Sequence, residues 1–544
     1  MSQEQSIHNS TSTEETIKND GRSRLYWLQK NIRTRLWTWM KANKVKGFLA
    51  LLAFMIIIFY MRAVFHPIAL GIRKYFVLVL LILAIIWLVR KWLREKKLRA
   101  KIIGNVVLLG IVALGYFYGK SVYRYIGLYY HYQTLNRQEI DLLPLTDQER
   151  IHPLNSIRVR LNQDGLPELA EATLPHIILR NDGRLDFSMC IGPSTDYWWQ
   201  RFTKNMKEVI SVEANAYNTN YSQRNRTEVN FDVGENLVLS REASTAAIKR
   251  LNIIDYFNYE PDEVKYVERA PNDWVQVMTL IKWTGFLIPR PVFGGVIVFE
   301  QMDDTPPLVN FFNRATFGKG TFIGPKDIHK YTYLANQNLQ SDYITRFTAE
   351  SFRFQNGFFA PMPGYHNEDV RIPNSVEDQN RQPFVAYFNF DGIIPQLGGG
   401  LYHYFGLEPY QEDKRTLSTS VFIPSNGDDV VYYFNHVEHS DFYMGSSSIK
   451  DKIVDSKKNY DWSSYHAAET RPYIKMIDGK RQFYWLSTIV TKVDPEGKES
   501  FGGTNPELTI TDAASGEVFW IEKKNLYKET DSSWVNQVKR HESY

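Results

Sequence analysis

Three apolar stretches near the start of the chain decide its fold: GFLALLAFMIIIFY at residues 47–60, YFVLVLLILAIIWLV at residues 75–89 and IIGNVVLLGIVALGYFY at residues 102–118. A helix that crosses a bilayer needs about 20 mostly apolar residues, because the hydrocarbon core is about 30 Å thick and each residue adds about 1.5 Å. With their flanks, the stretches predict three transmembrane helices at residues 47–66, 73–92 and 101–119. The first stretch is the shortest and Arg62 follows it closely, so it spans only if it tilts or continues through residues 63–65.

Lysine and arginine flank these stretches unevenly, and this asymmetry predicts their orientation. Residues 18–46 contain nine basic residues, residues 61–74 contain three and residues 90–101 contain seven. Short loops that are rich in Lys and Arg stay on the cytoplasmic side of a membrane. We therefore expect a cell-membrane protein with a cytoplasmic N-terminus, a short outer loop, an inner loop, and all residues after 119 outside the cytoplasm.

The net charge of +4 conceals two halves of opposite sign. Residues 1–133 contain 21 basic and 5 acidic residues, whereas the rest of the chain contains 43 basic and 55 acidic residues. The positive charge thus lies beside the predicted spans, where it meets the bilayer and its anionic lipid headgroups. We expect no nucleic-acid partner.

The residues before the first apolar stretch divide into two parts. Residues 1–21 are polar and nearly free of apolar side chains, which predicts a disordered cytoplasmic tail. In residues 22–46, apolar side chains recur every three or four positions among basic ones, as at Leu25, Leu28, Ile32, Leu36 and Trp39. This period predicts a basic amphipathic helix on the inner membrane surface. A cytosolic partner helix or a plain tail stays open as an alternative.

Cysteine usage indicates the kind of organism. Cys190 is the only cysteine among 544 residues, so the chain cannot form an internal disulfide. Large domains in oxidising compartments often carry disulfides. Their absence here favours a bacterial protein, and we expect Cys190 to be a buried, unreactive thiol.

The long C-terminal region predicts an α+β fold dominated by strands and rich in aromatic residues. We expect a connector at residues 119–150 and two extracytoplasmic lobes at residues 151–370 and 371–544, separated by a polar, turn-rich stretch near residues 365–382. Short β-branched and aromatic runs predict strands at residues 176–179, 228–231, 275–282, 294–299, 384–390, 416–423, 430–434, 483–491, 508–510 and 518–522. Helices are expected at residues 197–213, 240–251 and 339–353.

Turn residues sharpen three of these expectations. Residues 275–301 are apolar overall, but Pro289, Arg290 and Pro291 interrupt them, which favours two strands over a fourth span. The pair Asp478-Gly479 between two strand-like runs predicts a hairpin. A second hairpin is expected at Ser515-Gly516.

The best metal candidate is NHVEHSD at residues 435–441, which contains His436, Glu438, His439 and Asp441. Metal sites need such ligands to converge on one point. On a strand, however, His436 and Glu438 point to one face and His439 to the other. We expect solvated polar residues at a strand end and no metal.

Other short motifs lack the partners that their chemistry requires. The serines after Gly445 lack the second glycine of a nucleophile elbow. The glycines at residues 398–400 and 318–320 lack the Lys-Ser/Thr of a phosphate-binding loop. We therefore assign no catalytic residues, no cofactor-binding residues and no cofactor.

A glycan-binding site is the main alternative reading. Asp303-Asp304 and Asp428-Asp429 supply paired carboxylates, and glycosidases need two carboxylates in a cleft lined with aromatics. The candidate aromatics are Tyr197, Trp198, Trp199, Tyr432, Tyr433, Tyr443, Tyr484 and Trp485. Adjacent aspartates are more typical of a solvated turn, and aromatics also build cores and protein interfaces.

The sequence thus favours a multi-pass bacterial membrane protein with a large external domain that binds a protein partner in a cell-envelope assembly. We expect it to be non-enzymatic, although catalysis stays open. One alternative is an extracytoplasmic binder or hydrolase of cell-wall glycan. Another is an oligomeric transporter or channel subunit, although the spans contain no Asp or Glu to mark an ion path.

Overall fold

The computed structural model describes the chain apart from residues 1–43, 94–97, 154–156, 159–160, 162–165, 168, 216–225, 286, 303–306, 363–368, 374–381, 396, 412–414, 440–441, 492–506 and 522–544. The expected disordered tail and nearly all of the expected interfacial helix lie outside the described residues. The chain divides into two compact units, residues 1–64 and residues 65–544. The described part of the first unit is helical.

The first two apolar stretches belong to one helical run rather than to two separate helices. Helix α2 (Lys44–Leu93) includes both stretches, with non-helical backbone only at Tyr75. Helix α3 (Leu98–Thr134) contains the third stretch and continues well beyond the expected end at residue 119. Within the described part of the chain, one helical stretch, Met61–Trp92, is long and apolar enough to cross a membrane. The connector between the first two stretches stays helical because one of its faces packs on the large domain, as described below.

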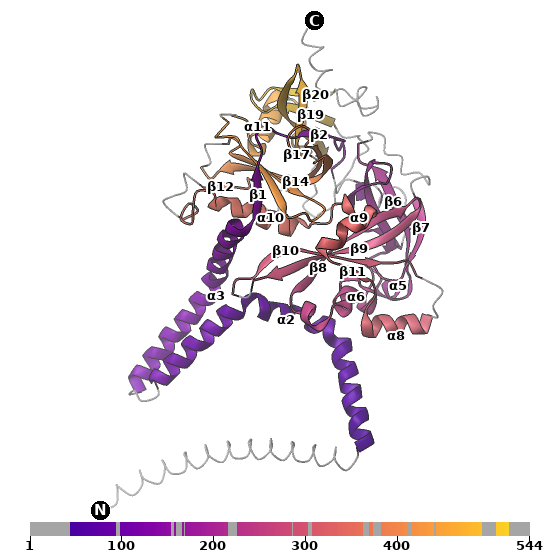
Figure 1. Ribbon diagram of the computed structural model, residues 1–544, viewed down its shortest axis with the longest axis vertical. Helices are drawn as coiled ribbons and strands as arrows, with labels where there is room; N and C mark the ends of the chain where they lie inside the picture. The colour runs from indigo at the N-terminus through magenta and orange to yellow at the C-terminus, as the bar shows by residue number, and fades with distance from the viewer. Residues whose placement is uncertain are drawn as a thin grey trace, which may run out of the picture. The chain divides into compact units, whose positions relative to one another are not determined.

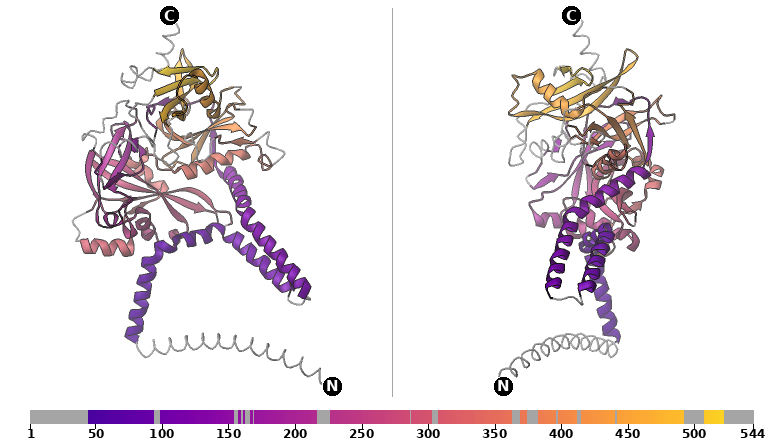
Figure 2. Two further views of the ribbon diagram at one scale, coloured as in Figure 1. Left: turned by 180° about the vertical axis from the view of Figure 1, so that it is seen from behind. Right: turned by 90° about the vertical axis from the view of Figure 1, so that its left-hand side faces the viewer.

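The second half of α2 lies beside α3 as a helical hairpin (Figures 1 and 2). Gly115 and Gly119 of α3 face Ile82 and Leu78 of α2. A Cβ added at Gly119 would lie 3.2 Å from Leu78 Cδ1, and one added at Gly115 would lie 3.8 Å from Ile82 Cδ1. Small residues four positions apart let two helices approach closely.

The names lobe 1 and lobe 2 are kept below for residues 151–370 and 371–544, the ranges that the sequence predicts. Lobe 1 contains two antiparallel sheets. Its strands are β3 (Ala170–Ala172), β4 (His176–Leu179), β5 (Leu185–Pro193), β6 (Met206–Glu213), β7 (Arg226–Phe231), β8 (Tyr259–Ala270), β9 (Asp273–Thr284), β10 (Arg290–Phe299) and β11 (Thr321–Ile323). One sheet has the order β3-β5-β6-β7, with β4 also paired to β5, and the other has the order β11-β10-β9-β8. Residues 275–301 thus form two paired strands, as predicted.

Short helices surround these sheets. They are α5 (Trp198–Thr203), α6 (Ala243–Arg250), α7 (Ile253–Tyr256), α8 (Pro307–Phe317), α9 (Thr332–Ala335) and α10 (Asp342–Ser351), with 3₁₀ turns η2 (Leu239–Arg241), η3 (Pro325–Lys330) and η4 (Phe352–Phe354). The predicted helix at residues 197–213 is wrong in its second half, which is strand β6. Because most β6 side chains are buried, the strand lacks the alternating pattern that identifies a half-exposed one.

Lobe 2, residues 371–544, is built on a seven-stranded sheet and a four-stranded sheet. Its strands are β12 (Val370–Arg371), β13 (Phe384–Asn389), β14 (Gly399–Pro409), β15 (Thr419–Pro424), β16 (Val430–Asn435), β17 (Tyr465–Ile477), β18 (Lys480–Thr491), β19 (Glu507–Asp512) and β20 (Val518–Ile521), and its helix is α11 (Ser446–Ser456). The smaller sheet has the order β17-β18-β19-β20. Asp478 and Gly479 both adopt positive φ between β17 and β18, which is the turn that the hairpin prediction requires.

The expected connector contributes two strands to the larger sheet. Strands β1 (Asn136–Glu139) and β2 (Leu145–Asp147) form its two edges, in the order β1-β16-β15-β14-β13-β2, and β12 pairs with β14. Strand β1 runs parallel to β16, with Asn136 opposite Val430. Residues 136–147 are therefore part of lobe 2 rather than a linker.

Shared cores join the two lobes and α3. Val385 and Leu401 of lobe 2 pack with Phe187 and Ile210 of lobe 1. Another core contains Leu128 and Tyr132 of α3 together with Phe352, Phe405 and Val421. Residues 65–544 accordingly form one compact unit, and most of the stretch where a break was expected lies outside the described residues.

Candidate functional site

The helical segment Phe65–Lys74 of α2 lies on one end of lobe 1. Leu70 is buried in the lobe 1 core, and His66 Nε2 lies 2.9 Å from the Tyr259 carbonyl oxygen. Arg73 donates from Nε to Asn258 Oδ1 at 3.2 Å and from Nη2 to the Gly285 carbonyl at 2.7 Å. The connector between the first two apolar stretches is therefore a docked helix.

An ion pair closes this contact at the end of the segment. Lys74 Nζ lies 2.7 Å from Glu260 Oε2 and 4.0 Å from the centroid of the Trp283 ring. Trp283 Nε1 donates to the same carboxylate oxygen at 2.8 Å. The Lys74 side chain thus contacts both β8 and β9, immediately before the kink at Tyr75.

The C-terminal part of α3 contacts the same end of lobe 1. The Tyr123 hydroxyl donates to the Leu287 carbonyl in the β9–β10 loop, and Arg290 donates to the Thr134 hydroxyl. His131 Nε2 lies 3.1 Å from Thr348 Oγ1 of α10. We call these contacts and those of Phe65–Lys74 the anchor junction. Through it, both ends of the α2–α3 hairpin are attached to one lobe.

Helix α3 also enters lobe 2 directly. Only Leu135 separates Thr134, where the helix ends, from Asn136, where β1 begins. Arg137 Nη1 donates to the Tyr132 carbonyl at 2.7 Å, and its guanidinium lies 4.0 Å from the Tyr132 ring centroid. The hairpin and lobe 2 therefore share a continuous, hydrogen-bonded backbone.

A buried polar cluster lies where the two lobes meet. Lys265 Nζ of β8 pairs with Glu263 Oε2 at 3.2 Å, and His403 Nδ1 of β14 lies 3.0 Å from Ser425 Oγ. Burial, with Lys265 nearby, lowers the pKa of His403 to about 3. Burial likewise lowers the pKa of His176 to about 4. Both imidazoles are therefore neutral at physiological pH, which suits structural contacts between lobes.

A second buried charge cluster lies inside lobe 1. The Asp232 carboxylate pairs with Arg314 Nη1 and with Lys319 Nζ, each at 2.5 Å. The Asp232 side chain is 4% exposed and that of Arg314 is 9% exposed. Asp232 thus links α8 and the glycine-flanked Lys319 to the end of β7, so the glycines at residues 318–320 serve this contact.

The metal candidate around His436 does not converge on one point. His436 is buried, and its Nε2 lies 2.8 Å from Ser420 Oγ, whereas Glu438 and His439 are exposed. The His439 ring stacks on Phe434 with a centroid distance of 4.5 Å. The expectation of solvated residues is therefore wrong for His436, because β16 turns it into the core, and Asp441 lies outside the described residues.

The aromatic residues proposed for a sugar cleft separate into core and surface. Tyr432, Tyr484 and Trp485 are buried. Trp198 and Trp199 are 54% and 66% exposed, and the Trp198 ring stacks on Phe202 at 5.6 Å. Asp428 and Asp429 are exposed in a turn, as expected, and Asp303-Asp304 lies outside the described residues.

The remaining candidates take structural positions. Cys190 is buried and its thiol is free, and burial raises its pKa. Ser447 donates to Glu408, so this serine serves a side-chain contact at the start of α11. In the part of the chain that the structure describes, no three His, Cys, Asp or Glu side chains are grouped to hold a metal ion.

Sequence reasoning missed the anchor junction. Its signal was present in the apolar residues of the connector, such as Leu70, and in the tyrosines of α3. Tyr125 and Tyr129 pack edge-on against Phe354 and Phe358 of lobe 1. No protein-family model matches the chain, and no curated protein matches it in sequence.

Proposed function

We propose that this chain is a multi-pass bacterial membrane protein whose large domain lies outside the cytoplasm and binds a protein partner of the cell envelope without catalysis. The anchor junction carries the proposal. The residues after the first apolar stretch and the residues after the third contact the same lobe, so they belong on the same side of a bilayer.

This placement favours three spans in the order that the basic residues predict. If Phe65–Lys74 and the end of α3 share one side, the hairpin between them crosses the membrane and returns. The first stretch, within α2, then supplies the third crossing and places the basic N-terminal residues on the opposite side. The close approach of Gly115 and Gly119 to α2 supports the hairpin, because packing at small residues is typical of membrane helices.

The exposed aromatic cluster on α5 supports binding of a protein. Tyr197, Trp198 and Trp199 are all exposed, and tryptophan and tyrosine are enriched at the centres of protein interfaces. Three large aromatic side chains exposed side by side form the kind of apolar patch that marks an interaction site. We assign the partner contact to this cluster.

Cysteine labelling tests the location. In a Cys190→Ala background, single cysteines replace Glu300 and Glu95, and a membrane-impermeant maleimide is added to intact cells. We expect position 300 to react and position 95 to react only after permeabilisation. The unmodified chain is the control, because its buried Cys190 stays unlabelled. Equal accessibility of the two positions contradicts the topology.

Site-specific photocrosslinking tests the partner. A photoreactive amino acid at position 199 should yield one discrete adduct in growing cells, and the same residue at position 437, which is also exposed, should not. Trp198→Ser should abolish the adduct without changing the amount of protein, since this side chain contributes little to the core. Absence of any adduct at position 199 contradicts the proposed partner site.

A further inference from the structure

Lobe 1 exposes a group of large apolar side chains at the end that carries the anchor junction. On the α2 segment Phe65, Ile68 and Ile72 are 51%, 62% and 56% exposed. On α7 Ile253 and Ile254 are 72% and 76% exposed, and Phe257, directly after the helix, is 45% exposed. We call these six residues the α7 patch.

The local structure of α7 directs its apolar side chains outward. Asn252 caps the helix by accepting hydrogen bonds from the backbone N–H groups of Ile254 and Asp255. Tyr256 is buried, and its ring packs edge-on against His66 with a centroid distance of 5.0 Å. Because Tyr256 fixes one face of this single turn on α2, Ile254, two positions away, lies on the opposite face, and Ile253 at the start of the turn is exposed as well. Their exposure is built into the fold.

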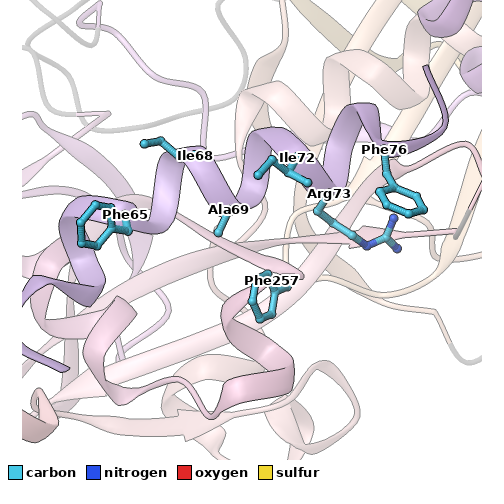
Figure 3. Close-up of a pocket in the computed structure, with 7 residues that line it drawn as sticks. All are labelled: Phe65, Ile68, Ala69, Ile72, Arg73, Phe76 and Phe257. Carbon is cyan, nitrogen blue, oxygen red and sulfur yellow. The ribbon is translucent and has the colours of Figure 1, made fainter. Parts of the chain in front are cut away.

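An apolar hollow lies between the α2 segment and α7. It has a volume of about 430 Å³ and is lined by Phe65, Ile68, Ala69, Ile72, Arg73, Phe76 and Phe257. Figure 3 shows Phe257 reaching from α7 toward the helix beside Ala69 and Arg73. The volume falls in the range of about 300–1,000 Å³ that is common for ligand sites. The single polar side chain of its lining, Arg73, is engaged with Asn258 and Gly285.

We infer that the α7 patch lies in the bilayer interface and that a lipid acyl chain occupies the hollow. The inference rests on the proposed membrane location. The helix that lines the hollow belongs to the stretch Met61–Trp92, which is long and apolar enough to cross a membrane, and it continues after the kink at Tyr75 into the apolar residues 76–92. The hollow therefore opens at the level where this helix enters the hydrocarbon.

Continuity with the span selects lipid over other occupants. A side chain next to the start of a span meets headgroups and the first acyl carbons, where exposed Ile and Phe are stabilised by burial. Leu287, in the loop that receives the Tyr123 hydroxyl, is also 63% exposed at this end of the lobe. Apolar side chains thus project from three separate segments around the point where α2 and α3 meet the lobe.

Fluorescence quenching by labelled lipid tests the inference. The full-length Cys190→Ala protein is placed, one copy per disc, in phospholipid nanodiscs that contain a lipid with a nitroxide at acyl carbon 5. A bimane fluorophore is attached to a cysteine at position 254 or, as a matched control, at position 437. Val437 is 67% exposed and follows β16 at the end of the strand remote from α3. We expect at least threefold stronger quenching at position 254.

Two further measurements, on an Ile253 variant and with an aqueous quencher, test the same inference. Replacing Ile253 with Gln, a change that leaves the core intact, should at least halve the quenching at position 254. Aqueous iodide should quench position 437 strongly and position 254 weakly. Equal lipid quenching at the two positions overturns the inference, as does strong iodide quenching at position 254. Because each disc holds one copy, weak iodide quenching at position 254 cannot come from cover by a second copy.

The result is separable from the proposed topology. The hollow adjoins the membrane whichever side lobe 1 occupies, so a lobe in the cytoplasm would still give lipid quenching at position 254. That case would instead appear as failure of position 300 to react from outside the cell. Lipid quenching therefore reports on the α7 patch alone.

Discussion

Lys74 and Glu260 join the anchor helix to the sheet of lobe 1 through an ion pair of 2.7 Å, with side chains that are 21% and 33% exposed. The two residues are 186 positions apart in sequence. Their contact fixes the helix at the point where α2 bends, so it couples the α2–α3 hairpin to the lobe.

The Lys74–Glu260 pair predicts a measurable coupling. We compare Lys74→Met, Glu260→Gln and the double variant in nanodiscs by hydrogen exchange of β8 and β9. A partly exposed pair with an additional aromatic contact is worth about 1 kcal/mol, so each single change should speed exchange about fivefold. The double variant should exchange no faster than either single variant. Additive effects of the two changes would contradict the coupling.

Hairpin packing predicts different costs at two glycines of α3. Gly119→Leu places a side chain against Leu78, whose Cδ1 lies only 3.2 Å from the position of a Cβ, whereas the Cβ of Gly110 meets nothing within 4 Å. Overpacking of this kind costs about 1–3 kcal/mol. Thermal unfolding in nanodiscs should therefore show a lower midpoint for Gly119→Leu and little change for Gly110→Leu. Equal shifts would remove the evidence for close packing.

Removing the charge of the Asp232 carboxylate should strongly destabilise lobe 1. Asp232→Asn leaves the buried Arg314 and the partly exposed Lys319 without a carboxylate, and removing one partner from a buried ion pair costs about 3–5 kcal/mol. Limited proteolysis should then cleave lobe 1 at much lower protease concentrations. Asp451→Asn is the matched control, since Asp451 and Arg415 are 68% and 50% exposed, and it should have almost no effect.

The burial of His403 predicts that the protein loses part of its folding stability at low pH. The pKa of His403 is about 3 in the folded protein and near 6.5 in the unfolded chain, so the unfolded state binds the proton first as pH falls. The contribution of His403 to folding stability is therefore complete above pH 6.5 and is lost progressively from pH 6.5 down to pH 3. At pH 5 the loss is about 2 kcal/mol. His403→Asn, in which an amide replaces the ring nitrogen that contacts Ser425, should remove this component.

The measurement for His403 is the thermal midpoint of the full-length protein at pH 7 and at pH 5. The drop between the two should be smaller for His403→Asn than for the unmodified chain. His329→Asn, a change at an exposed histidine, serves as the control and should leave the drop unchanged. An identical drop for His403→Asn would show that His403 titrates normally.

The elements that sequence predicted well carry local signals. Turn residues located the hairpins at Asp478-Gly479 and Ser515-Gly516, because positive φ restricts the residue types there. Short β-branched and aromatic runs located strands such as β4, β9 and β16. Strand β5, around Cys190, was missed because its sequence LDFSMCIGP contains a single β-branched residue and no such run.

The site was less predictable because its contacts are long-range. Nothing near Arg73 in sequence indicates that it pairs with Asn258, and a short polar run such as β1 becomes a strand only through its partner β16. Tertiary contacts also overrode the prediction of separate helices, because the burial of Leu70 stabilises helix where a loop was expected.

The single residue between α3 and β1 has a consequence for how the protein finds other molecules. A domain on a flexible tether samples a volume that grows with linker length. Here the chain passes from helix to sheet through Leu135 alone, so lobe 2 has no tether. The position and orientation of lobe 2 relative to the hairpin are therefore fixed by the fold. Under the proposed membrane location, a binding partner would therefore meet lobe 2 at one fixed height and angle, and lateral diffusion of the whole molecule would bring the two together.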